Sequence, residues 1–467
     1  MHTRFVSLIA GAALLLMPAY ADAQDVRPGQ AYRGLFGPNT ATTGEALTLN
    51  GAIGAGWDSN LFLAQRDQVL ISGVPILAPS TPFDSGIYSQ FSGGLGYSRS
   101  GTKLQFQAQE SSSARRYPDY PLLASHGVAA RLTWNPTKRL SFSTSHEFAY
   151  QPWQTFASFP ALFDLPLRFD RAVAPNQAYA SIGGNSRSYV TSSSVTTQLS
   201  RKSSLMAGYS SQLSTYNNSA EFVGPIRWDI FAVGYGRYTN QSGIVRFNHG
   251  VTQNLGWHIG YGYSEARYSG DVRRYRGHLL DAGLDYSRSL SITRRTTFSF
   301  STGAVAIEQP EQTGGYRRYD VTGRATLGRE IGRTWNASAS YVRSAEYLET
   351  ARAPYFYDGV VLELQGLVSR RMGFRATAGA TYGDLGIDRV RNQRERFETE
   401  YADAAMSFGF SRHLALTTEY VFTRYSLNRL GISLPGAGPT MHRHDVVVSL
   451  SAWVPVFERG RKTNAAR

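Results

Sequence analysis

Residues 86–98 read GIYSQFSGGLGYS, and their side chains alternate between two chemical classes. Ile87, Phe91 and Leu95 fall on one face, whereas the positions between them are mostly small or polar. An alternation with period two is typical of a β-strand whose two faces meet different surroundings. The stretch therefore predicts a strand with one apolar face and one polar face.

The same period continues from about residue 45 to residue 457, and no segment with a helical period competes with it. The second face consists mainly of Gly, Ser, Thr, Gln and Asn, whereas a soluble sandwich would carry Lys and Glu there. The apolar face carries Tyr, Phe and Trp near the segment ends. These features favour an all-β protein, a transmembrane antiparallel up-and-down β-barrel with lipid outside and a polar lumen.

The connections between the predicted strands alternate between short and long. The usual asymmetry of such barrels assigns the short turns to the periplasm and the long loops to the outside. The long connections are 58–85, 151–185, 217–227, 268–276, 308–316, 347–357, 385–399 and 427–441. The pattern predicts eighteen strands: 46–57, 86–98, 103–115, 125–134, 139–150, 187–200, 204–216, 228–238, 255–267, 277–289, 295–307, 317–329, 334–346, 358–369, 373–384, 400–411, 413–426 and 442–457. The region 228–254 fits this count least well, and sixteen strands is the alternative.

Composition removes several classes of protein. The 467 residues include no Cys, which excludes a disulfide framework, a Cys-ligated metal site and thiol catalysis. The mean hydropathy is −0.30 and only the N-terminus is continuously apolar, which excludes a polytopic helical membrane protein. A soluble propeller is the alternative reading of a weak repeat of about 40 residues, but its blades need apolar residues on both faces.

The N-terminus has the pattern of an export signal. Arg4 precedes an apolar run at 6–17, and Ala21-Asp22-Ala23 matches the small-x-small cleavage pattern. An uncleaved membrane anchor is the alternative. The predicted organisation is a signal peptide at 1–23, a periplasmic lead at 24–45, the barrel at 46–457 and a basic tail at 458–467. The expected location is the outer membrane of a Gram-negative bacterium.

Two sequence features carry a family resemblance. Gly56-Trp57-Asp58-Ser59-Asn60-Leu61-Phe62 follows the first predicted strand, and a turn-plus-strand pattern recurs, as in 287–300. With these features the chain resembles the bacterial β-barrel porins and outer-membrane β-barrel proteins, including those encoded beside exopolysaccharide genes. The resemblance implies an outer-membrane location, supports a transport role and implies no catalytic residues. The expected function is a pore for small hydrophilic or anionic solutes, or a conduit for an exported exopolysaccharide.

The formal net charge is +14, and it comes from Arg rather than Lys. Only four of the 48 basic residues are Lys, so 44 are Arg. The candidate pore-lining residues, assigned from the period, are Arg131, Arg318, Arg324, Arg375, Asp281, Asp285, Asp320, Glu363, Asp403 and Glu419. Arg rings in a pore favour anions. The alternatives are a mixed-charge wall that pairs internally, and loop arginines, such as Arg115-Arg116, that bind lipopolysaccharide.

Two long connections, 58–85 and 151–185, are apolar for loops. They either enter the lumen as a constriction or pack on each other above the rim. The candidate constriction residues are Trp153, Phe163, Asp164, Arg168 and Asp170. If both loops filled the interior, the protein would be a plugged structural or adhesive barrel.

One cluster is a candidate catalytic site: His442-Arg443-His444-Asp445, at the outer end of the last predicted strand. Two His and an Asp could serve a rim hydrolase or protease, but a polar rim cluster is the simpler interpretation. No metal-ligand spacing or phosphate loop is present. The chain is expected to be no enzyme and to need no cofactor or metal.

The expected partners follow from location. They are outer-membrane lipid and lipopolysaccharide, the barrel assembly machinery and, for an exporter, periplasmic polysaccharide-export proteins. Nucleic acid is not expected, because the arginines are spread along the chain and no reader motif is present.

Overall fold

The structure is a computed structural model, and it describes residues 44–59, 69–71, 74–76, 85–118, 122–155, 180–217, 236–252, 254–268, 274–289, 296–309, 316–332, 334–348, 353–387, 395–428 and 440–460. The predicted signal peptide and most of the periplasmic lead lie outside the described residues. Among the described residues, no helix is long and apolar enough to cross a membrane.

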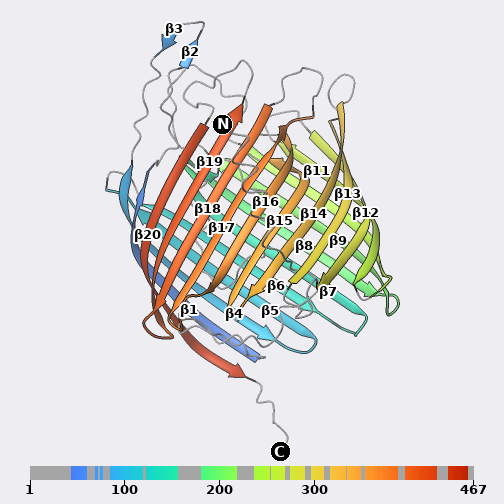
Figure 1. Ribbon diagram of the computed structural model, residues 1–467, viewed down its shortest axis with the longest axis horizontal. Helices are drawn as coiled ribbons and strands as arrows, with labels where there is room; N and C mark the ends of the chain where they lie inside the picture. The colour runs from blue at the N-terminus through green and yellow to red at the C-terminus, as the bar shows by residue number, and fades with distance from the viewer. Residues whose placement is uncertain are drawn as a thin grey trace, which may run out of the picture.

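The regular elements of the described residues are all strands. Their bounds are β1 Gly44–Asp58, β2 Val69–Ile71, β3 Val74–Ile76, β4 Gly86–Ser100, β5 Leu104–Arg116, β6 Leu123–Trp134, β7 Leu140–Thr155, β8 Ala180–Gln198, β9 Ser203–Asn217, β10 Gly236–Gly250, β11 Leu255–Tyr268, β12 Arg274–Ser289, β13 Thr296–Gln309, β14 Tyr316–Ile331, β15 Trp335–Leu348, β16 Ala353–Leu367, β17 Met372–Leu385, β18 Glu395–Gly409, β19 Leu414–Asn428 and β20 Thr440–Gly460. β2 and β3 form a separate two-stranded ribbon, drawn at the top of Figure 1.

The other eighteen strands close into one antiparallel barrel (Figure 1). Each strand pairs with its neighbour in the sequence, and β1 pairs with both β4 and β20. Ile53 of β1 lies opposite Phe91 of β4 on one side and Leu450 of β20 on the other. The predicted fold class and the count of eighteen are confirmed. Because paired residues share a face, the register assigns an inner or outer face to side chains around the whole ring.

The outer face of the barrel is apolar. The large side chains of this face are exposed, including Leu49, Ile53, Trp57, Phe91, Leu95, Trp134, Val195, Tyr209, Val245, Ile259, Leu280, Val321, Leu416, Leu450 and Val454. An apolar band around a closed barrel, in which each strand bonds to its two neighbours, is the surface that a bilayer requires. The predicted location in the bacterial outer membrane is confirmed.

The two ends of the barrel differ. Short turns such as Gly101–Lys103 and Asn135–Arg139 join strands at the lower end of Figure 1, where β1 begins, and longer connections lie at the upper end. This asymmetry makes the upper end extracellular. The strands have 12 to 21 residues, more than the roughly 9–11 that span a bilayer, so they extend beyond the membrane.

One predicted strand was wrong. The strand placed at 228–238 is β10 at Gly236–Gly250, and a short turn follows at 251–254. The outer face of β10 carries Gln241 and Gly243 beside Val245, and Ile244 faces inward. The apolar alternation is therefore weak along the real strand. β1 and β20 also extend slightly beyond the predicted barrel, because Gly44 pairs with Gly460.

Candidate functional site

The inner face of the barrel divides into two kinds of wall. Among the described side chains, the inner faces of β4, β8 and β9 carry no charge and consist mostly of Ser, Gly, Gln and Thr. Hydroxyls on this side of the lumen bond across strands, as between Ser145 of β7 and Ser192 of β8 at 2.9 Å and between Ser113 of β5 and Ser125 of β6 at 2.7 Å. The inner faces of β4, β8 and β9 therefore offer hydroxyl and amide groups, whereas β5, β6 and β7 add the charges of Arg115, Arg131 and Glu147.

The other half, from β10 to β20, carries paired charges. Arg375 Nη2 lies 3.0 Å from Asp403 and 2.8 Å from Glu419. Arg246 lies 3.4 Å from Asp281, which also lies 2.9 Å from the ring of His258. These guanidinium groups are held by carboxylates of neighbouring strands, so little of their charge is left to attract anions.

Register places all ten predicted pore-lining residues on the inner face, although the side chain of Asp285 lies outside the described part. The described inner-face arginines are Arg115, Arg131, Arg246, Arg318, Arg324, Arg375 and Arg443. The acids opposite them are Asp58, Glu147, Asp281, Asp320, Glu363, Asp403, Glu419 and Asp445. Glu330 also faces inward by register, so the arginines do not outnumber the acids, which supports the mixed-charge wall over an anion-attracting ring.

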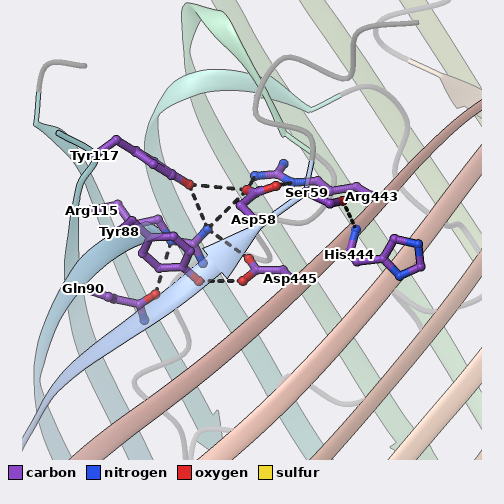
Figure 2. Close-up of polar contacts among 9 residues, drawn as sticks. All are labelled: Asp58, Ser59, Tyr88, Gln90, Arg115, Tyr117, Arg443, His444 and Asp445. Carbon is purple, nitrogen blue, oxygen red and sulfur yellow. Dashed lines mark hydrogen bonds and ion pairs between the residues drawn. The ribbon is translucent and has the colours of Figure 1, made fainter. Parts of the chain in front are cut away.

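A buried charge cluster, which we call the latch, joins four strands at the extracellular end (Figure 2). Tyr88 of β4 donates its hydroxyl to Asp445 of β20 at 2.6 Å. Arg115 of β5 donates to the same carboxylate at 3.0 Å, and its guanidinium lies 3.9 Å from the centre of the Tyr88 ring. All three side chains are buried, so β4 and β5 are tied to the last strand, β20, by polar contacts shielded from water.

The second half of the latch is built on Asp58 of β1. Arg443 of β20 donates from Nε to both carboxylate oxygens of Asp58, at 2.9 and 3.0 Å. Tyr117, just beyond the end of β5, donates to Asp58 at 3.4 Å. Burial raises the pKa of Tyr117, against a smaller opposite effect of Arg115, so its hydroxyl stays protonated as a donor.

Sequence reasoning missed the latch. Arg115 ended the predicted strand 103–115 and was also grouped with the loop arginines, but it is an inner-face residue of β5, and it is buried. Glu110 and Ser112 lie between Gln109, Ser111 and Ser113, so the residues before Arg115 carry little apolar alternation. Nothing in a single sequence links β5 to β20.

The extracellular mouth is narrowed by the tip of the β15–β16 hairpin. Pairing between β14 and β15 stops at Gly323 and Arg343, although both strands continue. Beyond that point Tyr347 contacts the inner-face Ser264, with 3.4 Å between their hydroxyl oxygens. The Arg318 guanidinium lies 3.8 Å from the centre of the Phe356 ring. The hairpin tip therefore leans across the mouth against the inner wall of β10–β14.

The contact between tip and wall is an aromatic core. Ala345, Tyr347 and Phe356 of the hairpin pack into a buried cluster with Tyr238, Ala266, Tyr268, Tyr275, Val305, Ile307 and Ile387. Toward the periplasm the inner face opens, because Gln105, Gln107 and Arg131 are exposed. The described inner face is thus exposed near its periplasmic end and partly covered by the hairpin at its extracellular end.

The predicted constriction residues lie largely outside the described part of the chain. Trp153 belongs to β7, but its side chain is not described, and Phe163, Asp164, Arg168 and Asp170 lie outside the described residues. The described part of the mouth is narrowed by a hairpin for which sequence reasoning had no signal.

The two residues proposed for catalysis at the rim, His444 and Asp445, lie on opposite faces of β20. Asp445 faces the lumen in the latch, whereas His444 faces outward and its Nδ1 lies 2.8 Å from the Tyr420 hydroxyl. Figure 2 shows the His444 ring pointing away from the cluster. The two side chains cannot act on one water molecule. Within the described residues, no group of three His, Asp or Glu side chains could hold a metal ion.

No family model and no curated protein match the chain. Solved structures that are similar include the FrpB iron transporter of Neisseria meningitidis (F3-3 variant), with 8% identity, 88% of this chain and 81% of that chain covered, and a TM-score of 0.42. Others are OpdQ of Pseudomonas aeruginosa (8% identity, 88% and 98% covered, TM-score 0.41) and OccK11 (OpdR) of the same organism (12%, 91% and 100%, 0.39). A likeness at this level shows no shared function.

Proposed function

We propose that this protein is an outer-membrane diffusion channel for small hydrophilic solutes. The observation that carries the proposal is the inner face, which consists mainly of small and polar residues outside the aromatic cluster at the mouth and is exposed near its periplasmic end. A closed barrel with an apolar outer belt and such a lining is suited to hold a water-filled path.

The wall chemistry points to uncharged, hydroxyl-rich solutes. The arginines of the lumen are largely neutralised by carboxylates, so the channel should discriminate weakly between anions and cations. The Ser, Gln and Thr side chains of β4, β8 and β9 can exchange hydrogen bonds with a sugar or polyol as it passes. Solutes of this class are the proposed cargo.

Conductance of the refolded mature barrel in a planar bilayer tests the proposal. We expect small, steady conductance with a reversal potential close to zero in a KCl gradient. Swelling of liposomes that contain the protein should then be faster in a neutral monosaccharide than in a sugar acid of similar size. Folded protein that gives neither conductance nor swelling would exclude an open channel and leave a plugged structural barrel.

Export of a longer saccharide is the finer form of the same proposal. The hydroxyl-rich wall supports it, because a polysaccharide would meet the same donors and acceptors along the strands. Neutral oligosaccharides of increasing length, added on one side of the bilayer, distinguish the two. Transient blockade that lengthens with chain length supports a saccharide path, and the absence of blockade restricts the channel to small solutes.

A further inference from the structure

The outer face ends in a basic surface on one sector of the barrel. The last outward-facing residues at the extracellular ends of β10–β14, the basic rim, are Arg237, Glu265, Arg267, Arg274, Arg276, Glu308 and Arg317. This surface carries five arginines but only two carboxylates. Exposed Tyr261, Tyr263 and Tyr319 lie directly below them on the same face. The sector therefore carries net positive charge where the strands leave the apolar band.

The carboxylates of the basic rim are recessed behind its guanidinium groups. Glu265 accepts from Arg267 and, at 2.7 Å, from Arg274. The Glu265 side chain is 15% exposed, whereas that of Arg267 is 62% exposed. Glu308 and its partner Arg317 show the same contrast, with 20% and 52%. The surface that meets the surroundings is thus formed by cations.

Arg276 lies between these two pairs. Register sets it opposite Glu265 on one side and Glu308 on the other, and both carboxylates are already engaged by other arginines. Within the described chain Arg276 forms no ion pair, and its Nε is buried without a hydrogen-bond partner. The centre of the basic rim therefore holds a guanidinium group whose charge no carboxylate of the described chain pairs.

The neighbouring sector shows that this excess is local. At the extracellular ends of β15–β19 the outward-facing arginines are Arg343, Arg396 and Arg424, and the acids on that face are Asp358, Asp384, Glu398 and Glu400. Arg424 lies 2.8 Å from Glu400, with a half-exposed carboxylate, and Asp384 lies 3.3 Å from Arg318 of β14. With that acid paired to Arg318, the sector is neutral, although it lies at the same end of the barrel.

We propose that the basic rim binds the phosphate groups of an outer-leaflet glycolipid of the lipid A type. Guanidinium groups bind phosphate bidentately, and clusters of Arg beside a bilayer recruit anionic headgroups. The tyrosines below them suit the interface between headgroups and acyl chains. Two arginine–glutamate pairs on either side of Arg276 match a headgroup with two separated phosphates better than a phospholipid with one. The inference is independent of transport through the lumen.

Displacement of a fluorescent, bis-phosphorylated lipid A from the folded, full-length mature barrel in detergent tests the proposal. The double variant Arg267→Gln with Arg317→Gln should bind lipid A about tenfold more weakly. The matched control, Arg396→Gln with Arg424→Gln on the neutral sector, should bind as the unchanged protein does. Glu265→Gln with Glu308→Gln removes the opposing charges and should bind severalfold more tightly.

Three results would overturn it. Equal loss in both arginine double variants would mean general attraction to a basic protein. If lipid A without its phosphates bound as well as the intact lipid, the interaction would not depend on phosphate. Phosphatidylglycerol binding as tightly as lipid A would make the ligand an ordinary phospholipid. Heat-dependent gel migration shows whether the Arg267/Arg317 variant folds. If it does not fold, the Glu265/Glu308 variant tests the site instead, and an unchanged affinity for lipid A in that variant counts against the proposal.

Discussion

The Tyr88 hydroxyl of β4 donates to the Asp445 carboxylate of β20, at 2.6 Å, across the inner face of β1. The two residues are 357 positions apart in the sequence, and β1 lies between their strands at the point where the barrel closes. With Arg115 on the same carboxylate, the contact fastens the seam between the first and last strands. A buried bond of this kind stabilises closure because leaving Asp445 unpaired in a dry site is costly.

Tyr88→Phe removes the hydroxyl of this bond and keeps the ring against Arg115. We expect the free energy of unfolding to fall by about 1–3 kcal/mol, because the substitution leaves a buried carboxylate with one donor fewer. Urea unfolding in detergent or lipid, followed by Trp fluorescence, measures it.

Tyr420→Phe is the matched control for the latch. Its hydroxyl bonds His444 on the outer face, where Tyr420 is 39% exposed, so its loss should change stability by less than about 0.5 kcal/mol. Equal effects of the two substitutions would contradict the assigned role of the latch.

Gly56→Ala tests how Tyr88 reaches across β1. A Cβ at position 56 would lie 2.5 Å from the Tyr88 ring and 2.7 Å from the backbone oxygen of Val446, so the ring and the strand must shift. We expect a loss of roughly 1–3 kcal/mol in stability from the overlap. Gly93→Ala, whose Cβ would meet nothing closer than 3.8 Å, serves as the control and should be well tolerated. A stable Gly56→Ala barrel would show that the ring is not held in this position.

Arg375→Gln should move the ion selectivity of the channel toward cations. The substitution leaves Asp403 and Glu419 on the inner face without their shared cation. The reversal potential in a KCl gradient reports the change. Arg424→Gln, on the outer face, should leave it unaltered. An unchanged reversal potential in the Arg375 variant would place this cluster outside the conducting path.

Phe356→Ala should loosen the hairpin tip in the mouth. Phe356 is 4% exposed and packs in the aromatic cluster that holds β15–β16 against the wall. Loss of a buried Phe weakens such packing by about 3–5 kcal/mol. Single-channel recordings should show larger or more frequent openings.

Tyr382→Ala is the control for the mouth, since Tyr382 is 44% exposed and faces outward on the adjacent β17. Its recordings should match those of the unchanged protein. If both variants conduct alike, the hairpin tip does not restrict the mouth.

Most of the strands could be predicted because each needs only its own residues. Alternation such as that of residues 86–98 follows from the pleat, which turns successive side chains to opposite faces. For the same reason the candidate residues Arg131, Arg318 and Arg375 were assigned to the correct face. β10 was not predicted at its true position because its outer face includes Gln241 and Gly243, so the alternation of apolar and polar residues does not extend along the whole strand.

The contacts of the site could not be predicted, since they depend on register and closure. Arg115 stood at the end of the predicted strand 103–115 and was grouped with the loop arginines. The strand extends through it, and only closure of the ring brings its guanidinium to Asp445. His444 and Asp445 are adjacent in sequence, yet the pleat turns one outward and the other inward.

The sequence by itself determined a closed transmembrane barrel, because an alternating chain with an apolar face can satisfy its backbone in lipid in no other way. It also determined which residues face the lumen, since that property repeats every second position. The tertiary structure decided which charges meet. The latch, the neutralised Arg375 and the hairpin tip in the mouth join strands far apart in the chain, and their partners are set by ring closure, register and strand bending rather than by local pattern.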